Sequence, residues 1–131
     1  MPPREGVVEP VIMDRPTTAP ADLAALADRL EGDLLVDETA RRVYATDASE
    51  YQERPLGVAL PASDRDVGEL VRFAAATGTP LIPRGAGTSL AGQVVGSGLV
   101  VDLGRHLNRI LALDVGRRTV RVQPGVVRND L

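Results

Sequence analysis

The chain contains no cysteine, and this absence removes several classes of chemistry at once. Disulfides, thiolate nucleophiles and cysteine-ligated iron–sulfur or zinc sites are excluded within these residues. The only histidine is His106, so a metal site built from several histidines is excluded as well. We therefore expect no metal site in this chain, and we interpret His106 as a residue of a turn.

Lysine is also absent, and this excludes one well-known phosphate-binding loop. A P-loop needs a lysine directly after its last glycine. Gly87 and Gly92 have the P-loop spacing, but Gln93 follows them. A Rossmann fingerprint fails in the same stretch, because Leu90 stands where Gly85 and Gly87 would require a third glycine.

Aromatic residues are scarce, since Tyr44, Tyr51 and Phe73 are the only ones. The core must therefore be built from aliphatic side chains. Single-stranded nucleic acids are usually held on exposed aromatic rings, so this composition argues against an RNA-binding surface. The net charge is −3 and the arginines are spread along the chain, so no basic patch indicates a nucleic-acid partner.

Long apolar runs are missing too. No run approaches the roughly 18 residues of a membrane span, and the N-terminus lacks the apolar core of a secretion signal. The 131 residues, 44% hydrophobic and 25% charged, have the ordinary composition of one soluble globular domain. We expect a cytosolic protein, and we leave open a peripheral association with a membrane through an electron-accepting partner.

What is present is an alternation of helical and extended patterns. Apolar spacing and capping residues predict helices over residues 22–30, 37–44, 63–77 and from 126 onward. Short apolar runs predict strands over residues 34–36, 58–60, 79–82, 99–103, 110–113 and 119–123. Residues 58–82 then form one βαβ unit. We expect a disordered lead over residues 1–20, a helical N-terminal extension over 21–55, and the first, truncated part of a larger domain over 56–131.

The stretch Pro83–Gln93 carries the strongest functional signal. It combines glycines, two hydroxyl residues and one arginine between two predicted strands. Glycine lets a ligand approach the main chain closely, and successive amides in such a turn can hold an anion. The stretch therefore predicts a cradle for a phosphate or diphosphate. A flexible connection between two strands remains the simpler alternative, because one glycine-rich run is a weak motif.

Several motifs occur together in one order along the chain. They are Asp47-Ala48-Ser49-x-Tyr51, Pro61, Pro83 to Gly92, Val101-Asp102-Leu103-x-Arg105 and Val120-x-Val122-x-Pro124-Gly125. With these motifs the chain resembles the N-terminal part of the FAD-linked oxidase family, whose flavin domain is also called PCMH-type or vanillyl-alcohol-oxidase-type. Within that family it is most similar to the D-lactate, glycolate and D-2-hydroxyglutarate dehydrogenase branch.

The resemblance implies an α+β fold, in which a βαβ unit is followed by a short mixed sheet, and it implies FAD as the cofactor. It assigns the diphosphate of FAD to the backbone and hydroxyls of residues 84–89. The residues it implies for cofactor binding are Pro61, Pro83, Arg84, Gly85, Ala86, Gly87, Thr88, Ser89, Gln93, Pro124 and Gly125.

One position departs from the family pattern. Many relatives have a histidine one place after the second glycine of the loop, and that histidine is covalently attached to the flavin. This chain has Thr88 there. A threonine hydroxyl offers no comparable nucleophilic nitrogen, so we expect FAD to bind non-covalently.

The implied activity is oxidation of a small 2-hydroxy acid, such as D-lactate, glycolate or D-2-hydroxyglutarate, by hydride transfer to FAD. No residue of this chain can be assigned as the catalytic base, and the electron acceptor is not specified. An iron–sulfur cluster would have to lie in a downstream region. Two alternatives remain: a non-enzymatic nucleotide- or phosphate-binding module, and another enzyme of the same fold, such as a reductase of cell-wall precursor synthesis.

Two polar groups outside the glycine-rich stretch admit a functional or a structural interpretation. Asp47, Tyr51 and Arg54 are clustered, and we favour a surface turn ordered by its own hydrogen bonds. Asp102 and Arg105 follow a predicted strand, and we favour a structural ion pair.

Overall fold

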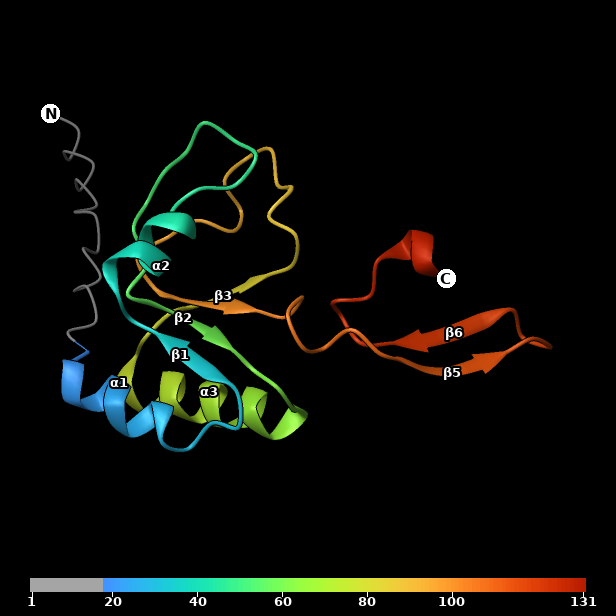
Figure 1. Cartoon of the computed structure of the whole chain (residues 1–131), viewed down its shortest axis with the longest axis horizontal. Helices are drawn as coiled ribbons and strands as arrows, with labels where there is room; N and C mark the ends of the chain where they lie inside the picture. Colours follow the sequence, from blue (N-terminus) through green and yellow to red (C-terminus); the bar gives the residue numbers. More distant parts are fainter. Residues whose placement is uncertain (1–17) are drawn as a thin grey trace, which may run out of the picture.

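The computed structural model describes residues 18–131. Of the predicted lead over residues 1–20, residues 1–17 therefore lie outside the described residues. Two sheets and short helices make up the described chain (Figure 1). In chain order the elements are α1 (Pro20–Ala27), β1 (Asp33–Leu35), α2 (Glu38–Val43), β2 (Gly57–Leu60), α3 (Asp64–Thr77), β3 (Leu81–Arg84), β4 (Leu99–Asp102), β5 (Ile110–Asp114), β6 (Thr119–Val122) and the 3-10 helix η1 (Arg128–Asp130).

The larger sheet has the strand order β1-β2-β4-β3. β4 pairs in parallel with both β2 and β3, and β1 pairs antiparallel with β2. α3 connects β2 to β3, which confirms the predicted βαβ unit within an α+β fold. Because β2, β3 and β4 are parallel, the residues that follow them, Pro61, Gly85 and Leu103, lie along one edge of the sheet.

α3 begins and ends at the capping residues that the sequence predicts, Ser63 and Gly78. The Ser63 hydroxyl accepts a hydrogen bond from the Asp66 amide at 3.3 Å, and this caps the first turn. Gly78 ends the helix in the left-handed conformation, with φ +71°, which glycine adopts at little cost. Leu70 and Phe73 are buried on its inner side.

The sheet is covered on both faces, as Figure 1 shows. α1 and α3 supply Leu23, Leu26, Leu70 and Phe73 to the core on one face, where they pack with Ala59, Leu99 and Val101. A smaller cluster on the other face joins Val58, Leu60 and Val100 to Leu35, Tyr44 and Ile82. The predicted aliphatic core is therefore present, with Phe73 buried in it and Tyr44 packed against it.

β5 and β6 form a separate two-stranded antiparallel sheet that extends away from the larger one (Figure 1). Every residue of β5 is exposed, including Leu111 and Leu113. The base of the hairpin is fixed by the Gln123 amide, which donates to the Arg109 carbonyl at 2.9 Å, and by the Gly125 amide, which donates to the Leu107 carbonyl at 2.8 Å.

Several boundaries differ from the sequence-based expectation: α1 begins and ends earlier than the predicted 22–30, and β1 is shifted back by one residue from 34–36. β3 extends through Pro83 and Arg84, because Arg84 still pairs with Asp102 of β4. The predicted helix from residue 126 is only the short 3-10 helix η1. Within residues 18–131, no helix has both the length and the apolar character needed to cross a bilayer.

Candidate functional site

A hollow of about 530 Å³ lies at the edge where β3 and β4 end. It is bounded on one side by the start of the glycine loop, which we define as residues 85–98, and on the other by the segment that follows β6. Ligand sites in sheets with parallel strands commonly form at this carboxyl edge. The lining residues are Tyr44, Gly85, Ala86, Asp102, Gly104, Arg105, Pro124, Gly125, Val126 and Val127.

The main-chain amides at the start of the glycine loop, of which Gly85 and Ala86 line the hollow, have no partners in the described chain. Within residues 18–131, none of the amides of Gly85 to Ser89 donates a hydrogen bond to another protein group. A Cβ added at Gly85 would meet no atom within 4 Å, so the space beside this residue is open. Gly87 has φ +70°, a conformation that side chains other than glycine rarely adopt. Unpaired amides beside an open space are suited to an anionic ligand.

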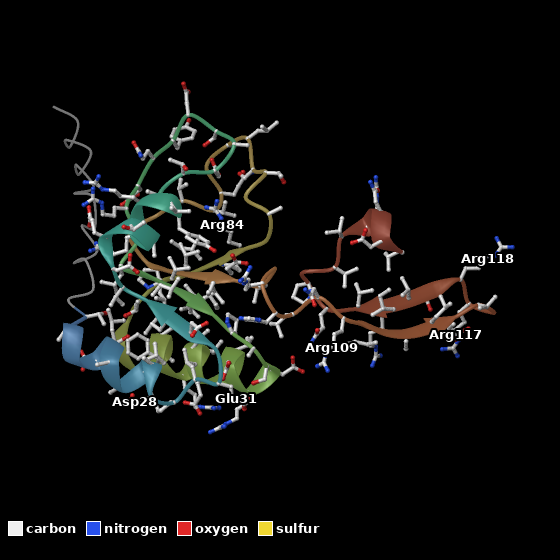
Figure 2. All side chains as sticks on the ribbon, viewed as in Figure 1. Asp28, Glu31, Arg84, Arg109, Arg117 and Arg118 are labelled. Carbon is white, nitrogen blue, oxygen red and sulfur yellow. The ribbon has the colours of Figure 1, made fainter. Side chains whose placement is uncertain are left out.

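Arg84 lies at the end of β3 rather than in the loop. Its guanidinium donates to the Thr46 carbonyl at 2.7 Å and lies 5.1 Å from the centre of the Tyr44 ring. Figure 2 shows Arg84 among the loops that lie over the larger sheet, where it is half-buried. Arg84 therefore connects two segments of the protein, and its charge is partly engaged by the Tyr44 ring.

Tyr44 and Asp102 form a polar contact on the wall of the hollow. The Tyr44 hydroxyl donates to Asp102 Oδ2 at 2.6 Å, and the Gly104 amide donates to Asp102 Oδ1 at 2.8 Å. Burial, and then the hydrogen bond to the Asp102 carboxylate, raise the pKa of Tyr44 to about 12. The phenol therefore stays neutral and keeps its hydrogen bond across the physiological pH range.

The opposite wall depends on one glycine. A Cβ added at Gly125 would lie 2.6 Å from the Leu103 carbonyl oxygen and 2.7 Å from the Leu107 carbonyl oxygen. Only glycine allows the chain after β6 to pass this close to the chain after β4. Pro124 and Gly125 are thereby brought beside Gly85 and Ala86, although they are distant in sequence.

The remaining predicted cofactor residues are distributed around the loop. Pro61 is fully buried after β2, and Pro83 is exposed on β3. The Gln93 side chain folds back onto its own loop, where Oε1 accepts hydrogen bonds from the Ser89 hydroxyl and the Ala91 amide. Thr88 is exposed. Of the predicted residues, the structure brings together at the hollow Gly85, Ala86, Pro124 and Gly125.

Several residues that line the hollow were not among the predicted cofactor residues. Tyr44, Gly104, Val126 and Val127 had no local sequence signal that pointed to a site. Asp102 and Arg105 were noticed, but as an ion pair. That prediction is wrong within the described chain, because the Asp102 carboxylate accepts hydrogen bonds from Tyr44 and Gly104 and forms no ion pair with Arg105.

The cluster of Asp47, Tyr51 and Arg54 is separated in the structure. Arg54 forms an ion pair with Glu38 at 2.8 Å. Asp47 accepts hydrogen bonds from the amide and the hydroxyl of Ser49, as expected for a self-ordered turn. The same segment also contacts the glycine loop, because the Ala48 amide donates to the Gly87 carbonyl at 3.0 Å.

Comparison with known proteins places this site in a family. Residues 55–131 match the model of the FAD binding domain. The chain is 42% identical over 106 residues to a D-2-hydroxyglutarate dehydrogenase of Pseudomonas putida, an alignment that covers 76% of this chain and 10% of that protein. It is 36% identical over 93 residues to the glycolate oxidase subunit GlcD of Bacillus subtilis, covering 70% of this chain and 20% of that protein.

A solved structure of alkyldihydroxyacetonephosphate synthase superposes on this chain with a TM-score of 0.71 at 23% identity, covering 89% of this chain and 24% of that one. This likeness supports the fold. The chain spans about a tenth of the length of the D-2-hydroxyglutarate dehydrogenases that it matches. Because the family model matches more than half of the chain, and the open glycine loop fits the anionic part of such a cofactor, this protein belongs to the FAD-binding-domain family.

Proposed function

We propose that this chain is the FAD-binding front part of a dehydrogenase that oxidises a 2-hydroxy acid by hydride transfer to non-covalently bound FAD. The observation that carries the proposal is the row of unpaired amides from Gly85 to Ser89, which begins at an open hollow lined by Gly85 and Ala86, in a chain that belongs to the FAD-binding-domain family. The names of the similar enzymes, which act on D-2-hydroxyglutarate and glycolate, support the substrate class.

In this proposal the glycine loop holds the diphosphate of FAD. The amides from Gly85 to Ser89 would donate to the phosphate oxygens, and the exposed hydroxyl of Thr88 would add a further donor. Arg105, which lines the same hollow, would contribute a positive charge. The segment Pro124–Gly125 would close the hollow from the opposite side.

FAD, when bound, supplies the acceptor for the hydride that leaves the substrate. We assign the catalytic base and the groups that clamp the substrate carboxylate to regions outside this chain, because the hollow contains no free side chain suited to proton abstraction. Tyr44 is neutral and donates to Asp102, so neither of these two residues is available as a base. We also propose a cytosolic location, with an electron acceptor that approaches the flavin from solution or from a membrane.

The proposal is tested on the complete protein, purified with its flavin. Addition of D-2-hydroxyglutarate, D-lactate or glycolate without oxygen should bleach the flavin absorbance with at least one of the three. Subsequent denaturation and filtration should release all flavin into the filtrate, because Thr88 offers no nitrogen for a covalent bond. Flavin retained on the polypeptide contradicts the non-covalent assignment, and a flavin that none of the acids reduces contradicts the substrate class.

A further inference from the structure

The loop from Ala45 to Glu53, which we call the clasp loop, is closed at its base. Thr46 and Gln52 form an antiparallel bridge, and the Glu53 amide donates to the Ala45 carbonyl at 3.0 Å. The segment between them is thereby held as a short hairpin-like projection. Figure 1 shows it beside the glycine loop, on the face of the sheet opposite α1 and α3.

The clasp loop is tied by one hydrogen bond to the glycine loop and by another to the end of β3. The Ala48 amide donates to the Gly87 carbonyl at 3.0 Å, and the Arg84 guanidinium donates to the Thr46 carbonyl at 2.7 Å. These hydrogen bonds fix the beginning and the centre of the stretch whose amides are unpaired. They use the Gly87 carbonyl and leave its amide free.

A third contact brings an aromatic ring against the loop backbone. Gly92 has φ +72°, and a Cβ added there would lie 2.8 Å from Cδ2 of Tyr51. The Tyr51 ring therefore covers the backbone at Gly92, and a larger residue would displace it. This explains why position 92, in the middle of the glycine loop, needs glycine although Gly92 does not line the hollow.

Asp47 orders the clasp loop from within, between Thr46 and Ala48, whose backbones contact Arg84 and Gly87. Its carboxylate accepts hydrogen bonds from the Ser49 amide at 2.8 Å and the Ser49 hydroxyl at 2.5 Å. Its Oδ2 is shielded from solvent and has no hydrogen-bond partner of regular geometry among the described residues. The pKa of Asp47 lies below its usual value, first because the Ser49 hydroxyl donates to it and also because the Ser49 amide does.

We propose that the clasp loop is a positioning element, with Asp47 at its centre, that holds the glycine loop in the form that receives the FAD diphosphate. A glycine-rich loop loses much conformational freedom when it becomes ordered. Ordering the loop before the ligand arrives removes that cost from binding. This inference rests on the proposed FAD site, and it extends the interpretation of Asp47 and Tyr51 as residues of a turn ordered by its own hydrogen bonds.

The experiment compares the complete protein with Asp47→Asn and with the control Glu50→Gln, which removes one negative charge from an exposed position in the same loop. Because the chain has no lysine, trypsin can cut it only at arginine, and no arginine lies between Arg84 and Arg105. The rate of tryptic cleavage at the Arg84–Gly85 bond in the FAD-free protein therefore reports the order of the glycine loop. Cleavage at Arg117 and Arg118, in the exposed β5–β6 turn, serves as an internal reference.

Asp47→Asn should raise the rate of cleavage at Arg84 about 10-fold and leave the reference rate unchanged, since hydrogen bonds to a charged group are among the stronger ones. It should also raise the FAD dissociation constant about 10-fold, measured by the change in flavin fluorescence on titration. Glu50→Gln should match the wild type in both measurements. Ser49→Ala should resemble Asp47→Asn in a milder form, whereas Ser49→Thr should restore wild-type behaviour because it keeps the hydroxyl.

Equal acceleration at Arg84 and at the reference bonds would show general destabilisation and overturn the proposal. Unchanged cleavage at Arg84 would overturn it as well. If the wild-type protein binds no FAD, the proposed function fails, and the cleavage comparison alone decides whether the clasp loop orders the glycine loop. If Asp47→Asn does not fold, Ser49→Ala and Ser49→Thr provide the same comparison.

Discussion

Tyr44 shows how one residue can join the site to the rest of the fold. It follows α2, its ring lies against the Arg84 guanidinium, and its hydroxyl donates to Asp102 at the end of β4. It also packs against the cluster around Val58 and Val100. A single side chain therefore fixes the ends of β3 and β4 relative to each other, and these ends form one wall of the hollow.

At the scale of a single residue, the titration of Tyr44 gives a prediction about the pH dependence of stability. An unfolded tyrosine releases its proton near pH 10.0, whereas Tyr44 releases it near 12. Between these values the folded state holds more protons than the unfolded state, so stability is fully present below pH 10 and is lost as pH rises toward 12. The partly exposed position reduces this loss to on the order of 1 kcal/mol.

Tyr44→Phe should remove the loss of folding stability that the wild-type protein shows between pH 10 and pH 12. The difference in tyrosinate absorbance between the wild-type protein and the variant, followed against pH, should titrate near 12, and thermal unfolding of the two proteins should show the stability loss in the wild type alone. A difference titration near 10 would mean that the hydroxyl is not held by Asp102.

At the scale of elements, the sequence predicted what depends on nearby residues. The order of helices and strands followed from apolar spacing and from caps such as Ser63 and Gly78. The extension of β3 through Pro83 could not be predicted locally, since it depends on pairing with β4. β3 is an edge strand, where the missing amide of proline is tolerated.

The candidate site was predictable only in part, for the same physical reason. The glycines within residues 85–92 predict, by residue type alone, a backbone that a ligand can approach closely. Tyr44, Arg105 and Val126 reach the hollow only through the register of the sheet and the close passage at Gly125, which no local pattern encodes. The hydrogen bond between Arg84 and Thr46, which ties the clasp loop to the end of β3, likewise joins residues 38 positions apart in the sequence.

Asp66 gives a prediction at the scale of elements. It is fully buried on α3, and its carboxylate accepts the amides of Glu31 at 2.8 Å, Gly32 at 2.9 Å and Ala62 at 2.8 Å. It thus joins the chain before β1 to the chain after β2. Burial acts to raise the pKa of Asp66, but the three amides outweigh it and the pKa is lowered.

Asp66→Asn should lower the stability of this region by about 2 kcal/mol or more, because an amide nitrogen would replace an oxygen that accepts hydrogen bonds. The measurement is hydrogen exchange of α3 in the complete protein under increasing urea. Asp64→Asn, an exposed change in the same helical turn, is the control. The lowered pKa also means that wild-type stability is retained above pH 3.8 and falls as pH drops through the folded-state value. Equal exchange in Asp66→Asn and Asp64→Asn would contradict this role.

At the scale of the whole molecule, the hollow is formed between two parts of the chain. The larger sheet contributes Gly85 and Asp102, and the segment after the β5–β6 hairpin contributes Pro124 and Val127. The hairpin itself exposes Leu111 and Leu113, and two strands alone are only marginally stable in water. The position of the hairpin relative to the sheet is set at its base, by the hydrogen bonds of Gln123 and Gly125.

The central claim is that the diphosphate of FAD binds against the main chain at Gly85. It is tested most directly by titrating FAD into the Gly85→Ala and Gly68→Ala variants and comparing their dissociation constants. A Cβ at Gly85 meets no protein atom within 4 Å, so the substitution should leave stability unchanged, yet it would occupy the space where the diphosphate approaches the backbone. Gly68 lies within α3, away from the hollow, where alanine is tolerated. The account predicts that Gly85→Ala raises the FAD dissociation constant about 10-fold or more, while Gly68→Ala leaves it at the wild-type value. Equal affinities in the two variants would show that the cofactor does not approach the main chain at Gly85, and would contradict the account.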